Sequence, residues 1–130
     1  MIQRFSSGGP YEQRIGYSRV VRAGDLFVTA GCTSVVDGVL MHHDDPYAQS
    51  LTAFSIGVDA LAAAGCPIEN VVQTRMYITK REHAEDVGRA HKAIFAEINP
   101  AATMVVVAGL IDPHMLVEVE LVGRCGAGRA

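Results

Sequence analysis

The sequence predicts an α+β fold in which two helices pack on one face of a mixed sheet. The prediction follows from the order of patterns along the chain, which is hairpin, helix, strand, helix, hairpin. It also follows from a composition of 49% apolar and 19% charged residues, which is typical of a folded chain. The chain has 130 residues without an obvious linker or repeat. We therefore expect one domain over residues 1–123 and a mobile tail at 124–130.

The first part of the chain is predicted to form two antiparallel strands. They cover residues 17–23 and 26–30 and flank the turn Gly24-Asp25. Asp37-Gly38 predicts a second tight turn, with a short extended piece on either side.

A long helix follows, and both of its ends are marked. Asp45 is a good N-cap, and Pro46 stands at the first helical position, where its missing N–H costs little. Gly65 ends the helix as a left-handed cap. Between these ends, apolar residues recur at spacings of four and three: Tyr47, Leu51, Phe54, Val58 and Leu61.

The central strand is expected over residues 71–79. Alternation places Val72, Thr74, Met76 and Ile78 on one face, and Gln73, Arg75, Tyr77 and Thr79 on the other. A second helix is predicted from about residue 82 to residue 98, with His91 on its solvated side.

The last hairpin joins strands at 103–108 and 116–122. Its residues 104–107 are apolar without alternation, which indicates a strand covered on both faces. Two helices can cover only one face of the sheet. We therefore expect another subunit to cover the second face.

Charge and cysteine content exclude several classes of protein. The net charge is −3 and the arginines are scattered, so no nucleic-acid partner is expected. The three cysteines are odd in number and far apart, which indicates reduced thiols in a cytoplasmic protein. The longest apolar run, residues 104–111, is much shorter than the roughly 20 residues of a membrane helix. No metal is expected, because adjacent residues such as His42 and His43 rarely converge on one ion. The sequence has no phosphate-cradling glycine loop, and no cofactor is expected.

Five short segments, in this order and spacing, resemble the RidA/YjgF family over nearly the whole chain. They are Ile15-Gly16-Tyr17-Ser18, Ala30-Gly31, the strand at 73–79, Asn99-Pro100-Ala101-Ala102-Thr103 and Val117-Glu118-Val119-Glu120. The resemblance implies a chorismate-mutase-like fold and a homotrimer with pockets at its subunit interfaces. It also implies the hydrolysis of enamine or imine acids to keto acids and ammonia, without a cofactor.

One position departs from the family pattern. The arginine that holds the substrate carboxylate in the family follows Pro-Ala, and here that position is Ala102. Alanine cannot form the bidentate contact of an arginine with a carboxylate. We therefore expect deamination of 2-imino acids to be weak or absent.

The candidate site residues follow from the resemblance and from the shared sheet face. The catalytic candidates are Glu120 and Tyr17, and the substrate-binding candidates are Gly31, Cys32, Arg75, Ala102, Thr103 and Met104. Each has a simpler structural interpretation. Glu120 and Arg75 can form an ion pair at a subunit interface, with Glu118 as the alternative carboxylate. Tyr17 can pack on a neighbour, Gly31 can be a bulge and Cys32 can be buried filler rather than a nucleophile.

The leading hypothesis is a trimer that binds a small anionic or carbonyl-bearing metabolite and hydrolyses or tautomerises an imine or enamine. The alternative is an accessory protein that binds a ligand without catalysis. A ribonuclease or translation inhibitor is a third hypothesis, which the acidic charge disfavours.

Overall fold

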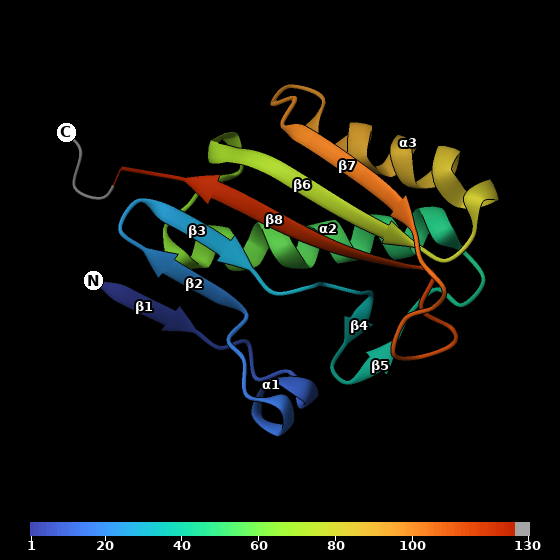
Figure 1. Ribbon diagram of the computed structural model, residues 1–130, viewed down its shortest axis with the longest axis horizontal. Helices are drawn as coiled ribbons and strands as arrows, with labels where there is room; N and C mark the ends of the chain where they lie inside the picture. The colour runs from blue at the N-terminus through green and yellow to red at the C-terminus, as the bar shows by residue number, and fades with distance from the viewer. Residues whose placement is uncertain (127–130) are drawn as a thin grey trace.

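A six-stranded sheet forms the centre of the structure, a computed structural model that describes residues 1–126 (Figure 1). The strand order is β1-β2-β3-β8-β6-β7, and only β6 and β7 are parallel neighbours. The strands are β1 (Ile2–Phe5), β2 (Val20–Ala23), β3 (Leu26–Thr29), β6 (Val71–Ile78), β7 (Ala101–Val106) and β8 (Val117–Arg124). The predicted mixed sheet is thus confirmed, but the predicted last hairpin was wrong. β7 and β8 lie on opposite sides of β6, which pairs with β7 in parallel and with β8 antiparallel.

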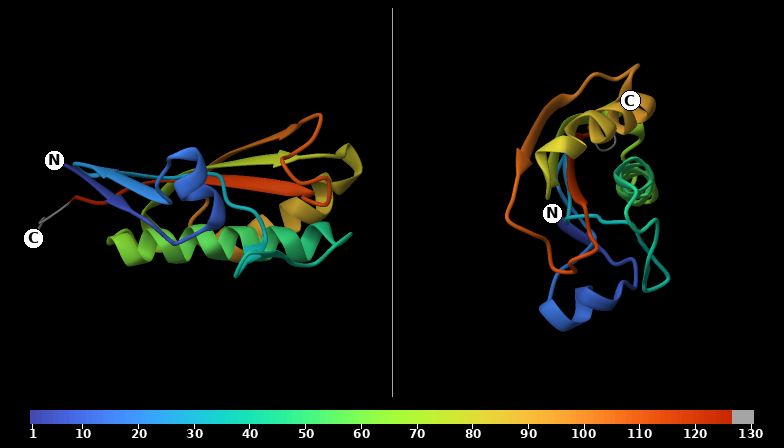
Figure 2. Two further views of the ribbon diagram at one scale, coloured as in Figure 1. Left: turned by 90° about the horizontal axis from the view of Figure 1, so that it is seen from below. Right: turned by 90° about the vertical axis from the view of Figure 1, so that its right-hand side faces the viewer.

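Two long helices cover one face of this sheet (Figure 2). They are α2 (Pro46–Ala64) and α3 (Ala84–Phe95). The ends of α2 are those predicted, since the Asp45 side chain accepts a hydrogen bond from the Ala48 amide at 3.0 Å and Gly65 has φ of 107°. A side chain at such a φ is strained, which is why glycine ends the helix.

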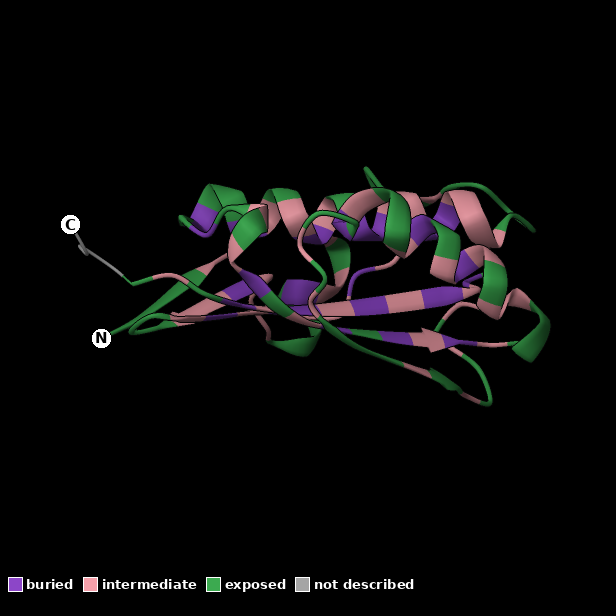
Figure 3. Ribbon diagram, turned by 90° about the horizontal axis from the view of Figure 1, so that it is seen from above, coloured by how far each residue is buried: buried purple, intermediate pink, exposed green. Residues whose placement is uncertain are grey.

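The core lies between the sheet and the two helices (Figure 3). Phe54 and Leu61 of α2 pack there with Val119 and Leu121 of β8, and all four are fully buried. Each such side chain contributes about 1.5–3 kcal/mol to folding. Along β8, buried residues alternate with half-buried ones, so Glu118 and Glu120 point to the face that the helices do not cover.

Smaller elements gather at one end of the sheet (Figure 1). The short helix α1 (Pro10–Ile15) precedes β2, and the hairpin of β4 (Val35–Val36) and β5 (Val39–Leu40) follows β3. The predicted Asp37-Gly38 turn is found in this hairpin, and both of its residues have positive φ. Neither β1 nor α1 was predicted.

The structure corrects several details of the sequence-based predictions. A β-bulge between Val71 and Gln73 buries Val71 and leaves Val72 exposed, which reverses the expected alternation at the start of β6. The second helix is shorter than expected, because residues 81–83 form a 3₁₀ turn and α3 ends at Phe95. The prediction that His91 faces solvent was wrong: its ring packs edge-on against Phe54, and its Nε2 lies 2.8 Å from the Thr74 hydroxyl.

The chain remains ordered in the sheet beyond residue 123. Arg124 is the last residue of β8 and pairs with Asp25 at 2.8 Å, and the Cys125 amide donates to the Asp25 carbonyl. The rest of the tail that the sequence predicts, residues 127–130, lies outside the described residues.

The second face of the sheet is open in this single chain. Val105 of β7 faces that side and is 41% exposed, and Val106 on the helix side is 48% exposed because β7 is an edge strand. The sequence predicts that both faces of residues 104–107 are covered, and this chain alone does not cover them. Within residues 1–126, no helix has the length and hydropathy needed to cross a membrane.

Candidate functional site

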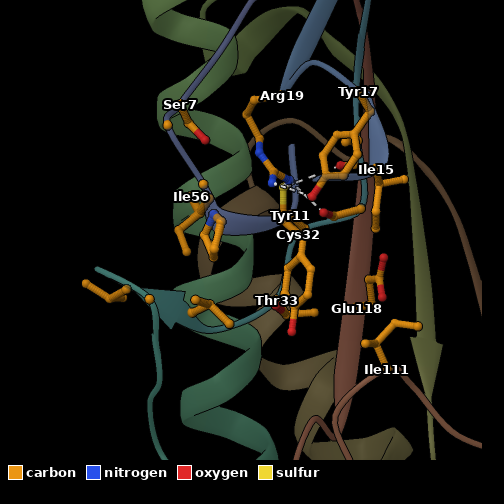
Figure 4. Close-up of a pocket in the computed structure, with 18 of the residues that line it drawn as sticks. Ser7, Tyr11, Ile15, Tyr17, Arg19, Cys32, Thr33, Ile56, Ile111 and Glu118 are labelled. Atoms are coloured by element: carbon orange, nitrogen blue, oxygen red, sulfur yellow. Dashed lines mark hydrogen bonds between the residues drawn. The ribbon is translucent and has the colours of Figure 1, made fainter. Parts of the chain in front are cut away.

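A cavity of about 710 Å³ lies at the end of the sheet where α1 and the β4–β5 hairpin meet (Figure 4). Its walls come from α1 and the segments on either side of it, the segment after β3, the hairpin, α2, the loop before β8 and the start of β8. Its polar groups include Tyr17, Arg19, Gly31, Asp37 and Glu118, and its apolar wall includes Ile15, Ile56, Ile111 and Met115. This volume suits a small organic ligand.

The Glu118 carboxylate lies directly against Gly31. A Cβ atom placed on Gly31 would be 1.8 Å from Glu118 Oε2 and 2.8 Å from its Cδ. The φ of Gly31 is not positive, so the backbone conformation does not require glycine here. Glycine is required because the Glu118 side chain approaches the backbone so closely. Burial raises the pKa of Glu118, the neighbouring Glu120 carboxylate raises it further, and Arg19 opposes the rise.

Arg19 holds the inner wall of the cavity together. Its side chain is 12% exposed, and its Nη1 donates to the Gly31 carbonyl at 2.6 Å. The guanidinium also donates to the Tyr17 hydroxyl and contacts Cys32 Sγ, each at 3.5 Å. Arg19 therefore fixes the position of Tyr17 relative to the segment after β3.

Glu12 balances the charge of Arg19 from behind the cavity wall. Its side chain is 5% exposed, and its Oε2 lies 3.6 Å from Arg19 Nε. The carboxylate accepts hydrogen bonds from the Ser6 hydroxyl at 2.8 Å, from the Ser7 amide and hydroxyl, and from the Gly9 amide. Burial alone would raise the pKa of Glu12, but these hydrogen bonds together hold it below its usual value. Glu12 is therefore ionised and compensates the guanidinium.

The structure brings some of the predicted site residues together and separates others. Tyr17, Gly31 and Cys32 line the cavity. The Cys32 thiol is buried, and burial raises its pKa, which makes it a poor nucleophile.

Glu120 and Arg75 form the predicted cross-strand pair, but outside the lining of this cavity. Glu120 Oε1 lies 4.0 Å from Arg75 Nη1 and accepts a hydrogen bond from the Tyr77 hydroxyl at 2.6 Å. That hydrogen bond raises the pKa of Tyr77. The side chains of Arg75 and Glu120 are 50% and 34% exposed, so this chain alone leaves the pair partly in water.

The three candidates on β7 lie on the far side of β6 from Glu118. Thr103 pairs with Arg75 and shares its open face, whereas Ala102 pairs with the buried Thr74 and Met104 with the buried Met76. Within this chain, none of the three lines the cavity.

Sequence reasoning missed Arg19 and preferred Glu120 to Glu118. No local pattern distinguishes an arginine that is buried among loop segments, since the residues that bury it come from α1 and from the segment after β3. A signal for α1 did exist. Gly9 is its N-cap, Pro10 is its first residue and Glu12 stands three residues after the cap, which is the spacing of a capping box.

Comparison with known proteins gives the following likenesses. A sequence model of the family described as endoribonuclease L-PSP matches residues 10–125. The Streptomyces coelicolor protein SCO2049, described as uncharacterized, is 40% identical over 126 residues, which are 97% of this chain and 94% of that protein. The crystal structure of Rv2704 from Mycobacterium tuberculosis, described as a member of the YjgF/YER057c/UK114 family, has a TM-score of 0.87 and 38% identity, covering 96% of this chain and 100% of that chain. E. coli TdcF, solved with bound serine, has a TM-score of 0.77 and 22% identity, covering 94% and 93%, which is a likeness of fold alone.

Proposed function

This chain belongs to the endoribonuclease L-PSP family, also called YjgF/UK114 or RidA, and from that premise we propose that it binds a small metabolite in the cavity and hydrolyses an imine or enamine group there. Its fold is the chorismate-mutase-like fold of that family. The observation that carries the proposal is the Glu118 carboxylate, which faces a cavity of about 710 Å³ beside Tyr17 and Gly31. No hydrogen bond from the described residues contributes to its pKa, so it remains available to a ligand or water.

Glu118 acts as the general base and then as the general acid. It accepts a proton from water while the water oxygen bonds to the imine carbon, and it passes that proton to the imine nitrogen, which gives a carbinolamine. Glu118 then takes the proton of the new hydroxyl group and gives it to nitrogen, the C–N bond breaks, and a carbonyl compound and ammonia leave. The reaction C=N–H + H₂O → C=O + NH₃ needs no cofactor. A raised carboxyl pKa lies closer to neutral pH, where such a group transfers protons best, and the contribution is typically 10²–10⁴-fold.

Tyr17 and Arg19 position the reacting groups in this proposal. The Tyr17 hydroxyl, held by Arg19, is a hydrogen-bond partner for the water or for the developing hydroxyl group. Glu118 takes the role predicted for Glu120, because the Glu120 carboxylate already accepts a hydrogen bond from Tyr77 and lies outside the cavity lining.

The proposal includes assembly into a homotrimer through the open face of the sheet. Val105 is exposed on that face, and the Arg75–Glu120 pair lies beside it. A neighbouring subunit would remove both from water. Light scattering at micromolar concentration should give three times the chain mass, and a stable monomer would contradict assembly. Free thiols at Cys32, Cys66 and Cys125 favour a cytoplasmic location.

The test compares two isosteric substitutions on one strand. Imines are generated by an oxidase in the presence of semicarbazide, and hydrolysis is followed as loss of the semicarbazone. Glu118→Gln should lower the rate at least 100-fold, whereas Glu120→Gln, which lies two residues along on the same face, should change it little. The reverse ranking would return the catalytic role to Glu120.

The alternative, an accessory protein that binds without turnover, predicts a different result. Ligand binding would then persist in the parent protein, but no imine would be consumed faster than in buffer. Ribonuclease activity has less support, because the one arginine in the described cavity lining is already compensated by Glu12.

A further inference from the structure

We infer that the ligand of this cavity carries a positively charged nitrogen, an amine or an iminium, on an apolar body without a carboxylate. The inference rests on the proposed function in that it concerns the same cavity, and it specifies the class of ligand. It is carried by the balance of charges around the cavity and by the chemistry of its walls.

The charges around the cavity sum to an acidic excess. Among the described lining residues, three are arginine, aspartate or glutamate: Arg19, Asp37 and Glu118. The Arg19 charge is compensated by the buried Glu12 at 3.6 Å, so Asp37 and Glu118 give the cavity a net negative charge. Opposite charges attract strongly where the surroundings are partly desolvated, so this cavity favours a cationic ligand.

An anionic ligand would find no free cation among the described lining residues. Arg19 Nη1 donates to the Gly31 carbonyl and its Nη2 to the Tyr17 hydroxyl, so both terminal nitrogens of the guanidinium have partners in the protein. Arg14 lies over the ring of Tyr11 at 5.7 Å but does not line the cavity. A carboxylate on the ligand would therefore meet Glu118 without a partner of its own.

The apolar wall indicates what the nitrogen is attached to. Ile15, Ile56, Ile111 and Met115 line the cavity, and Ile111 is 78% exposed in this chain. An apolar body that covers Ile111 would remove its side chain from water. A branched aliphatic chain packs on this wall, and a terminal nitrogen on that chain pairs with the carboxylates.

The hydrolysis is then that of an aldimine in its protonated form: R–CH=NH₂⁺ + H₂O → R–CHO + NH₄⁺. The iminium nitrogen pairs with the Glu118 carboxylate, which takes a proton from water as the C–O bond forms. It gives that proton to nitrogen, takes the proton of the new hydroxyl group as the C–N bond breaks, and passes it to the departing ammonia, so NH₄⁺ leaves and the carboxylate is regenerated. Asp37, in the exposed turn of the hairpin, attracts the cation to the cavity.

Binding tests the ligand class directly. Three probes with one branched skeleton are 3-methylbutylamine, 3-methylbutan-1-ol and 3-methylbutanoate, and their dissociation constants are measured by calorimetry. The amine should bind at least tenfold more tightly than the acid, which is about 1.4 kcal/mol, with the alcohol between them. Asp37→Asn should weaken the amine several-fold and leave the alcohol unchanged. Equal or tighter binding of the acid would overturn the inference.

Turnover separates this inference from the proposed function. A flavin amine oxidase converts 3-methylbutylamine to an aldimine, and an amino-acid oxidase converts leucine to the corresponding 2-imino acid, which differs by one carboxylate. Faster hydrolysis of the aldimine supports both. Faster hydrolysis of the 2-imino acid keeps imine hydrolysis and overturns the ligand class. Preferred binding of the amine without any turnover keeps the ligand class and overturns hydrolysis. Absence of both binding and turnover overturns both.

Discussion

Replacing Gly31 with alanine should disable the cavity while leaving the fold intact. The added Cβ would lie 1.8 Å from Glu118 Oε2, far inside van der Waals contact, so the carboxylate must move. It can do so, because it is the end of a flexible side chain, and because Gly31 has no positive φ the new residue is not strained. A displacement of ~1 Å in a reacting group can cost ~100-fold in rate. We therefore expect a loss of about 100-fold in imine hydrolysis, with a change in the free energy of unfolding of about 1 kcal/mol or less.

The assay pairs turnover with urea unfolding, and the chain offers a matched control. Gly88 lies inside α3 with nothing within 4 Å of an added Cβ, so Gly88→Ala should stabilise the protein by about 0.5–1 kcal/mol and leave hydrolysis unchanged. Full activity in Gly31→Ala would refute the reasoning, since the position of the Glu118 carboxylate against Gly31 would then be irrelevant to the chemistry. Unfolding of Gly31→Ala would refute it differently, by showing that Glu118 cannot move.

Two further predictions concern polar contacts away from the cavity. A double-mutant cycle of Arg75→Ala and Glu120→Gln should give a coupling above ~1 kcal/mol if a neighbouring subunit covers the pair, whereas a value of ~0–1 kcal/mol would show that the pair stays as exposed as in one chain. Burial lowers the pKa of His91, so the folded state favours the neutral ring, and this stability is present above the usual histidine pKa of about 6.5 and lost as the pH falls below it. The free energy of unfolding should therefore decline less from pH 7.5 to 5.5 in His91→Gln than in the parent.

The elements with strong local signals were predicted well. Asp45, Pro46 and Gly65 mark α2 because caps act through contacts within one or two turns, which a sequence displays directly. The turn at Asp37-Gly38 is predicted for the same reason, since its conformation depends on the residues in it. The bulge at Val71 could not be predicted, because the register of β6 is set by its pairing with the distant β8.

The helix that contains His91 was predicted correctly, but the side of the helix on which His91 lies was predicted wrongly. A histidine beside Lys92 suggests a solvated position, but a partner for its ring nitrogen exists on β6, where Thr74 accepts or donates at 2.8 Å. A buried polar side chain is tolerated when such a partner is present. Whether it is present depends on how α3 sits on the sheet, which the sequence of the helix alone does not contain.

The candidate site depends still more on contacts between distant segments. From sequence, Glu118 and Glu120 are equivalent, because both project from the same side of one strand. They differ only in their neighbours across the sheet. The Tyr77 hydroxyl donates a hydrogen bond to the Glu120 carboxylate, whereas Gly31, which has no side chain, leaves room for the Glu118 carboxylate beside the cavity. The effect of the Arg19 charge on a ligand likewise depends on Glu12, whose carboxylate lies beside the guanidinium and compensates it. An unpaired arginine would predict an anionic ligand, whereas a compensated arginine leaves the acidic groups dominant. The proposed ligand class therefore rests on the pairing of charges, and a count of charges in the sequence could not have supplied it.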